Sequence, residues 1–529
     1  MDSNYEYAWL IIAGIVVILI IRMIIGYWAS KKVENNVDYV LAGRRLPIWM
    51  AAPSIMATWF AAETLMGSSA TAYQYGFQGV VFDPFGATMC LVVAGFLIVR
   101  LARRAQYITI MDFFEHRYGV AMSVIGTVTQ IITYFGWTAA QIVAGGSILA
   151  ALLGWPLQTG MILVAVVVTL YTMMGGLWAD TALDFMQMFL TAGGLLLIVG
   201  FIVAKVGGFA NFFGMMGSQY VEQPFALWPI RTENGLDYLG YTGHQGWFYY
   251  IAAWISLGLG AIPAQDYLQR TCASESEATA VKSTYLAALL YISFGVLSPL
   301  IGMAAYGALG GGLEGDQVEF VLISMATKFL PPILAAVFVA ALASALMSTS
   351  DSSLLAGATM FTQNIVKVFK KDLSDKTELM LTRISLLVSG ILSLLIALFA
   401  STIYRLAVLS NTSILVGMAA PYIIGMWWKK ANHIGAIASF FSGVISWIVL
   451  TFAYYPQTLE ACALDTECAT WDAIYIGSTP AFVISVIVFV VASLLTQKID
   501  PPKQLTDING NPIETKNSWG FKDLDKIEA

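Results

Sequence analysis

Long apolar runs, separated by short charged or glycine- and proline-rich segments, make up most of this chain. Hydrocarbon about 30 Å thick needs roughly 20 consecutive apolar residues to be crossed by a helix. Runs of this kind recur almost throughout and predict thirteen helices, near residues 8–28, 48–76, 80–101, 119–153, 157–176, 183–206, 245–264, 279–307, 331–366, 379–400, 404–427, 434–455 and 477–496. The pattern therefore predicts an all-α integral membrane protein, with the lipid bilayer as its surroundings.

Composition supports the same class. Of the 529 residues, 58% are hydrophobic and 11% are charged, whereas soluble domains average roughly 25% charged residues. The net charge of −6 comes with no block of basic and aromatic residues that could follow a phosphate backbone. A nucleic acid is therefore excluded as the expected partner.

The basic residues predict the orientation. With the N-terminus outside, 22 of the 27 Lys and Arg residues fall in the cytoplasmic loops and the tail, as the positive-inside rule requires. An odd number of helices then places the C-terminus in the cytoplasm. No small-residue cleavage site follows the first apolar run, so we expect a retained helix in a plasma or bacterial inner membrane. The polar tail is expected to be poorly ordered.

The predicted helices divide into two groups of five. The segments are an extra N-terminal helix (1–30), a first five-helix repeat (48–206), an extracellular loop (207–244), a second repeat (245–427), two C-terminal helices (434–496) and the tail (497–529). The leading helix of the first group contains Pro53 and Gly67, and that of the second contains Gly258 and Pro263. Interrupted helices at matching positions indicate solute and ion sites at the bilayer midplane, although such residues also occur in ordinary membrane helices.

Hydroxyl groups are concentrated at residues 343–353, inside an otherwise apolar run. On a helix, Ala345, Ser348 and Thr349 stand at i, i+3 and i+4, so one carbonyl and two hydroxyls can converge. A monovalent cation is bound by such oxygen atoms. For a single hydroxyl, bonding back to its own helix is the better interpretation; for this cluster beside Asp351 we favour an ion site.

Several motifs together resemble the sodium:solute symporter family from about Asp38 to His433. They are Asp38 to Arg44, Ala57-Thr58-Trp59, Gly175 to Trp178 followed by Thr181 and Asp184, Ile262 to Arg270, Met347 to Ser353 leading to Phe361 to Asn364, and Lys429 to His433 with Gly435 and Ala436. Phe440 and Phe441 depart from the smaller residues usual in the last motif.

The resemblance implies a leucine-transporter-type fold of two inverted five-helix repeats that works by alternating access. It also implies that the main sodium ion is bound by carbonyls of Ala57, Phe60 and Ala345 and by the hydroxyls of Ser348 and Thr349. Some members bind a second sodium, for which the matching residues here are Asp184, Ser348, Asp351 and Ser352. An aspartate at 351 replaces a serine of those members, so it could assist a second sodium or carry a proton instead. One or two sodium ions are therefore expected.

For the solute, the motifs are nearest to choline-transporter-like members, which share tryptophans matching Trp59 and Trp137. Those members have a further tryptophan where Ala264 stands, and losing one aromatic wall weakens recognition of a quaternary ammonium. Glu63 and Thr64 lie in the expected break of the second helix, and a carboxylate at membrane depth indicates function.

We therefore expect a sodium symporter for a small amine-bearing zwitterion or cation, either amino-acid-like or choline-like. A supporting role for Glu63 in the helix break is an alternative of equal weight. A neutral sugar or vitamin is the alternative solute, and a transporter-like sensor is the alternative from another class. The three histidines, His116, His244 and His433, lie in or near loops without the spacing of a catalytic or metal site, so an enzyme is not expected.

The four cysteines indicate no zinc site. Cys90 and Cys272 stand alone, as inert packing residues do. Cys462 and Cys468 share one loop, and a disulfide or two free thiols are equally compatible with that spacing. Pattern alone leaves the oligomeric state open.

Overall fold

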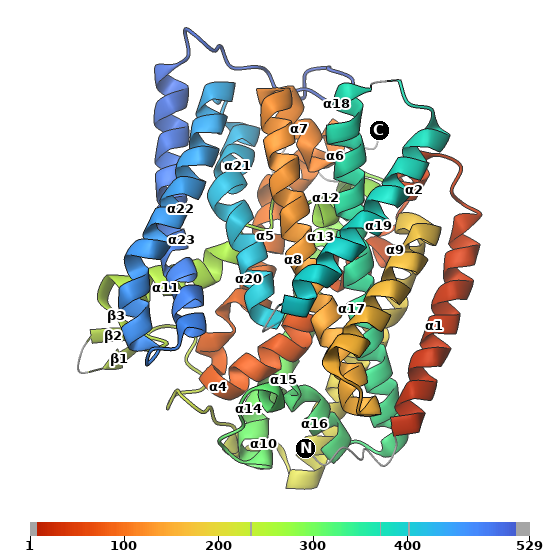
Figure 1. Cartoon of the computed structure of the whole chain (residues 1–529), viewed down its shortest axis with the longest axis vertical. Coiled ribbons are helices and arrows are strands. Elements are labelled where there is room, and N and C mark those ends of the chain that lie inside the picture. The colour runs from red at the N-terminus through yellow and green to blue at the C-terminus, as the bar shows by residue number, and fades with distance from the viewer. Residues whose placement is uncertain (1–7, 233–234, 371, 400–402, 515–529) are drawn as a thin grey trace.

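The computed structural model describes residues 8–232, 235–370, 372–399 and 403–514. It is a bundle in which α1 lies at one edge and the α22–α23 pair at the opposite edge (Figure 1). Residues 1–7 of the predicted N-terminal segment and residues 515–529 of the tail lie outside the described part.

The first half of the bundle, from residue 8 onward, is built of helices. Its elements are α1 (Ala8–Ser30), α2 (Asn36–Leu41), η1 (Ala42–Arg44), α3 (Ile48–Ala57), η2 (Glu63–Gly67), α4 (Ser68–Gly79), η3 (Val81–Gly86), α5 (Ala87–Leu97), α6 (Val99–Ala105), α7 (Ile110–Tyr118), α8 (Val120–Leu153), α9 (Leu157–Val206) and α10 (Phe209–Gly214).

A small antiparallel sheet of order β1-β2-β3 occupies the long loop between the two predicted repeats. The elements of this half are β1 (Ile230–Thr232), β2 (Gly235–Tyr238), β3 (Tyr241–Thr242), α11 (Gly243–Gly258), α12 (Gln265–Ala273), α13 (Glu277–Gly295), α14 (Leu297–Leu309), α15 (Asp316–Glu319), α16 (Val321–Phe329), α17 (Pro332–Phe361), η4 (Thr362–Val366), α18 (Lys367–Phe369), α19 (Asp375–Phe399), α20 (Ile403–Ile414), η5 (Leu415–Ala419), α21 (Ala420–Trp427), α22 (His433–Ala461) and α23 (Thr466–Leu495).

The membrane helices follow the apolar runs, but several are interrupted. Within the described residues, nine helices are long and apolar enough to cross a membrane, and a tenth span is a pair, Glu63–Gly79 and Val81–Leu97, bent by 74°. Two further apolar helices, Ile48–Ala57 and Leu157–Met173, are shorter. The number of membrane-length helices is smaller than the thirteen predicted because several of the predicted apolar runs are broken. The inverted repeat stays a prediction.

Both predicted helix interruptions are confirmed. The first run stops being α-helical after Ala57 and becomes helical again at Glu63, as the π-helical segment η2 that leads into α4. The second run stops at Gly258 and resumes at Gln265. A third bend lies within α9 at Gly176, whose φ is +57°. A Cβ on Gly176 would lie 2.5 Å from the carbonyl oxygen of Tyr39, so only glycine allows this approach.

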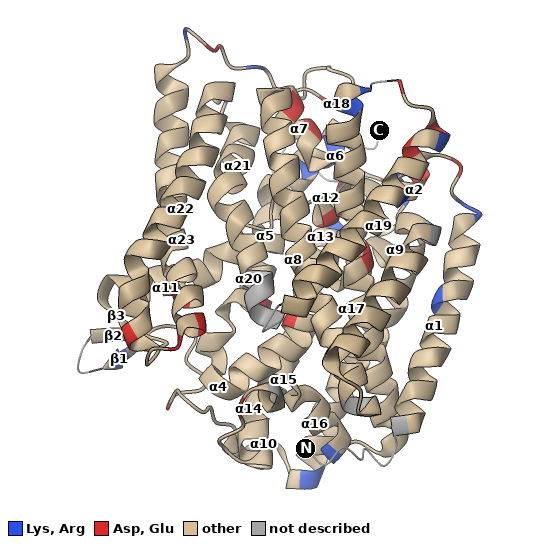
Figure 2. Cartoon of the chain, viewed as in Figure 1, with Lys and Arg blue, Asp and Glu red and all other residues tan. Residues whose placement is uncertain are grey.

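Charged residues gather at the ends of the bundle, while its middle is largely uncharged (Figure 2). Tail residues 497–514 fold back against the connection between α6 and α7: Tyr107 Oη donates to the carbonyl of Thr506, and the Ile508 amide donates to the carbonyl of Ala105. The prediction of a poorly ordered tail is therefore wrong for this stretch, because its backbone groups find partners on the protein.

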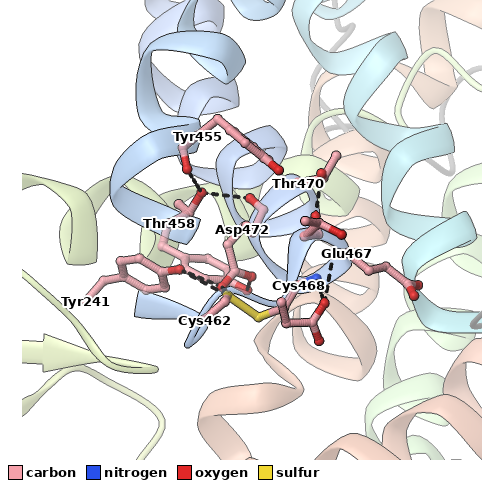
Figure 3. The surroundings of a disulfide bond; sticks show 12 residues. Tyr241, Tyr455, Thr458, Cys462, Glu467, Cys468, Thr470 and Asp472 are labelled. Carbon is pink, nitrogen blue, oxygen red and sulfur yellow. Dashed lines mark hydrogen bonds between the residues drawn. A yellow bond between two sulfur atoms is a disulfide. The ribbon is translucent and has the colours of Figure 1, made fainter. Parts of the chain in front are cut away.

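Cys462, directly after α22, forms a disulfide with Cys468 in the first turn of α23 (Figure 3). Beside it, the carboxylate of Asp472 accepts hydrogen bonds from the hydroxyls of Tyr241, at 2.7 Å, and Tyr249, at 2.9 Å. The α22–α23 hairpin is thereby joined to the small sheet and to α11. The other two cysteines, Cys90 and Cys272, are free and buried, as expected.

Candidate functional site

Helix α17 carries polar groups on three faces, and each face meets a different part of the bundle. Ser348 and Ser352, four residues apart, face acidic residues of α9. Thr349 faces the end of α3. Ser344 and Asp351, seven residues apart, face α1. All of these side chains are buried, so one helix presents distinct polar surfaces to three neighbours.

The residues expected to bind the main sodium lie where α17 meets the end of α3. The hydroxyl of Thr349 is 3.4 Å from the carbonyl oxygen of Ala57, the last residue of α3. Ala345 lies one turn before Thr349 on the same helix, and Ser348 is the residue directly before Thr349. Phe60 follows Ala57 in the interrupted segment, where its buried ring packs edge-on against Tyr291. The structure thus brings Ala57 and Thr349 together, with the other three residues adjacent to them in the chain or one helical turn away.

The hydroxyl of Ser348 also belongs to a buried charge network. It donates to Asp184 at 2.7 Å and lies 3.3 Å from a carboxylate oxygen of Asp180. The guanidinium of Arg270, on α12, pairs with Asp180 at 2.5 Å and with Asp184 at 3.5 Å. It also donates to Ser352. Asp184 and Ser352, expected at a second sodium site, are therefore arranged around a resident guanidinium.

Asp351, the third residue expected at the second sodium site, faces another arginine. Its carboxylate is 2.8 Å from the guanidinium of Arg22, on α1, and accepts from the Thr172 hydroxyl at 2.5 Å. Arg22 is 1% exposed. The structure thus separates the hydrogen-bond partners of Asp351 from those of Asp184 and Ser352.

Glu63 begins the helical segment after the first interruption and is 1% exposed. One carboxylate oxygen accepts from the Gln141 amide at 2.9 Å, while the other, Oε1, is buried with no hydrogen-bond partner. A buried carboxylate oxygen left unpaired is costly, so Glu63 offers one acceptor to a bound molecule.

Thr64, also expected to contact solute, is engaged by the protein itself. Its hydroxyl donates to Asp83 at 2.6 Å and lies 2.6 Å from the Tyr291 hydroxyl. Asp83 is 0% exposed and also accepts from Tyr291 at 3.0 Å. Asp83 therefore lies in the interior, because packing of α13 against the interrupted helix brings the Tyr291 hydroxyl to it.

The two helix interruptions are joined by a hydrogen bond. The indole nitrogen of Trp59, in the first, donates to the Asp266 carboxylate at 2.8 Å, just after the second. Ala264 caps α12 two residues before Asp266 and is buried. Trp137 is buried on α8, four residues before Gln141, so it shares the helix face that reaches Glu63. The expected substrate residues therefore border these two interruptions.

Acidic groups outnumber basic ones in this region. The acidic residues named here are Glu63, Asp83, Asp180, Asp184, Asp266 and Asp351, against the two guanidinium groups of Arg22 and Arg270. Within the described part of the chain, neither Glu63 nor Asp83 has a basic group within 4.0 Å in an ion pair. Buried charges are normally paired, so the site has the electrostatic character of a cation-binding site.

Sequence reasoning missed Arg22, Asp180 and Arg270 as parts of this region. Arg22 stands inside the first apolar run, and Asp180 stands between two runs, so each was visible as a charge at or near membrane depth. Arg270 ends the Ile262 to Arg270 motif, but its place in the sequence did not indicate that it is 0% exposed. The signal that could have identified these residues was a charged side chain inside or next to an apolar run.

Comparison with known proteins gives a family match over most of the chain. Residues 39–443 match the sequence profile of the sodium:solute symporter family. The human high affinity choline transporter 1 is 25% identical over 454 residues, covering 82% of this chain and 75% of the relative. The osmoregulated proline transporter OpuE of Bacillus subtilis is 25% identical over 508 residues, covering 92% and 95%.

The fold also has a counterpart among solved structures. The structure of a sodium-coupled sialic acid symporter, in a substrate-bound outward-open state, superimposes with a TM-score of 0.71. The alignment covers 95% of this chain and 100% of that one, at 20% sequence identity. Such a likeness establishes the shared transporter fold.

Proposed function

Because the chain belongs to the sodium:solute symporter family, we propose that it uses sodium entry to import a small solute carrying a positively charged nitrogen. The chain is a multi-pass membrane protein of a symporter family; the solute and the binding residues are the proposal. An amine-bearing zwitterion or a choline-like cation fits best.

Glu63 carries this proposal. Its Oε1 atom is buried and unpaired. Asp83 and Asp266 are further buried acidic residues of the same region, and the Trp59 indole donates to Asp266. A cationic nitrogen would supply the missing charge and donor together, and Trp59 and Trp137 would supply aromatic faces. Similar relatives that transport choline and proline, both with a charged nitrogen, support the same solute class.

For sodium, we propose the site formed by Ala57, Phe60, Ala345, Ser348 and Thr349. The contact between the Thr349 hydroxyl and the Ala57 carbonyl supports it, because it places two neutral oxygens together at the end of an interrupted helix. Asp184 and Ser352 remain candidates for a second sodium site. The Arg270 guanidinium contacts both residues, so a second ion would have to bind beside it.

We further propose two inverted five-helix repeats, residues 48–206 and 245–427, that alternate access to the site. The predicted orientation has the N-terminus outside and the tail inside. The disulfide at the α22–α23 connection supports this, because that connection would face the outside, where disulfides persist.

A ligand screen on the purified chain tests the solute class. Choline, glycine betaine, proline, glucose and sialic acid are added separately in sodium and in potassium, and the melting temperature is measured. A specific ligand stabilises the folded state by mass action. We expect stabilisation by a cation or zwitterion in sodium alone. Stabilisation by glucose and by none of the charged-nitrogen compounds would contradict the proposal.

A further inference from the structure

Helix α1 lies at the edge of the bundle (Figure 1). It nevertheless carries a buried arginine, Arg22. Its buried residues are Ile11, Ile18, Arg22, Gly26 and Ala29. The spacings of seven, four, four and three residues keep these positions on one face, against α9 and α17. Arg22 therefore occupies a position on this face that the pattern otherwise gives to an apolar residue.

Every identified contact of the Arg22 guanidinium is with α9 or α17. Nη1 donates to the carbonyl of Ser344 at 2.7 Å and to its hydroxyl at 3.0 Å. Nη2 donates to the Asp351 carboxylate at 2.8 Å and to the Tyr171 hydroxyl, whose ring also faces the guanidinium. The contacts hold one cation against α17 in a fixed position.

Without Arg22, the Asp351 carboxylate would need another positive charge, supplied by an exchangeable cation. A carboxylate at membrane depth must be neutralised by a bound ion, a proton or a fixed basic group. Asp351 is 3% exposed, and Arg22 is its only ion-pair partner among the described residues. Asp351 lies two residues after Thr349, on the helix that carries the proposed sodium ligands.

We propose that Arg22 is a tethered cation that takes the place of a coupling ion at Asp351. The inference rests on the proposed sodium symport and adds that α1 helps to set the number of ions transported. Because a covalently attached guanidinium cannot leave with the solute, Asp351 contributes no exchangeable charge to the cycle. Replacing Arg22 by a neutral residue is then expected to convert Asp351 into a site for sodium or a proton.

Space and further oxygen atoms for such an ion are present beside the pair. A cavity of about 10 Å³ is lined by Gly26 of α1, by Tyr171, Thr172 and Asp180 of α9, and by Asp351. This volume corresponds to about one water molecule. Loss of the Arg22 side chain would enlarge it, and hydroxyl and carboxylate oxygens would then line the space.

Equilibrium binding of radioactive sodium to the purified full chain, without solute, tests the proposal. The wild type is compared with Arg22→Gln, with Arg22→Gln/Asp351→Asn, and with the control Lys31→Gln. Lys31 directly follows α1 and is exposed, and its one identified contact among the described residues is with the ring of Tyr27. We expect Arg22→Gln to bind about one sodium more than the wild type, and the double and control variants to bind the wild-type number.

A proton could take the place of the added sodium, and a second measurement detects it. The melting temperature of Arg22→Gln in potassium would then fall as pH rises, because the unfolded chain gives up that proton more easily. The double variant should show no such fall. If Arg22→Gln shows neither an added sodium nor this pH dependence, the proposal is overturned.

The double variant decides the question alone if Arg22→Gln does not fold. Its two neutral side chains need no ion, so a folded double variant with the wild-type sodium number supports the proposal. A smaller number would show that Asp351 already binds sodium beside Arg22, and would overturn it. A wild type that binds no sodium would instead contradict the proposed symport, before any variant is compared.

Discussion

Replacing Glu63 by glutamine tests the solute-binding proposal most directly. The substitution keeps the shape of the side chain and one oxygen that can accept from Gln141, but it removes the negative charge. The side chain makes no other identified hydrogen bond, and the oxygen with no partner is the one offered to the solute. The variant should therefore fold and bind sodium as the wild type does.

The expected loss of solute affinity follows from burial and from the neighbouring charges. Truncating one partner of a buried charge pair costs about 2 to 5 kcal/mol. Asp83 and Asp266 remain in Glu63→Gln and still attract a cation, so the lower part of this range applies. A loss of about 2 to 3 kcal/mol raises the solute Kd roughly 30-fold to 150-fold.

Calorimetric titrations of solute and of sodium on the same purified variant provide the assay. Glu378→Gln is the matched control, because Glu378 is also a buried carboxylate but pairs with Lys367 at 2.8 Å instead of facing the interruptions. It should leave the solute Kd unchanged. Equal losses of sodium and solute affinity in Glu63→Gln would refute the reasoning, because they would indicate that Glu63 supports the helix interruption that both sites share.

Three further outcomes are expected. Thr349→Ala removes one proposed sodium ligand, so the sodium concentration at half-maximal stabilisation should rise roughly tenfold, the effect of about 1.4 kcal/mol; an unchanged midpoint would reject the ligand. Asp351→Asn alone leaves Arg22 buried without its partner and should reduce the free energy of unfolding by about 3 to 5 kcal/mol, whereas Arg22→Gln/Asp351→Asn should recover most of it in the same thermal melts. Cys462→Ser/Cys468→Ser should lower the melting temperature under oxidising conditions, since closing a short loop contributes about 2 kcal/mol, and a reductant should abolish the difference from the wild type.

The sequence alone determined the class of the protein and the position of most of its helices. Apolar runs of membrane length admit few structures other than helices, because backbone groups in hydrocarbon must bond within their own segment. Glycine and proline likewise located both interruptions, after Ala57 and after Gly258. The hydroxyl cluster around Ser348 was recognisable because helical spacing fixes which side chains share a face. Each of these conclusions depends on residues near one another in the chain.

Only the tertiary structure decided which polar groups meet. Arg22 pairs with Asp351 across 329 positions, and Arg270 pairs with Asp180 across 90. Helical periodicity says which face a side chain occupies, but not which neighbour covers that face. That choice depends on how the helices pack in three dimensions. The same packing buried Asp83 beside Thr64 and left one oxygen of Glu63 unpaired, so the charge balance of the site emerged only from the assembled bundle.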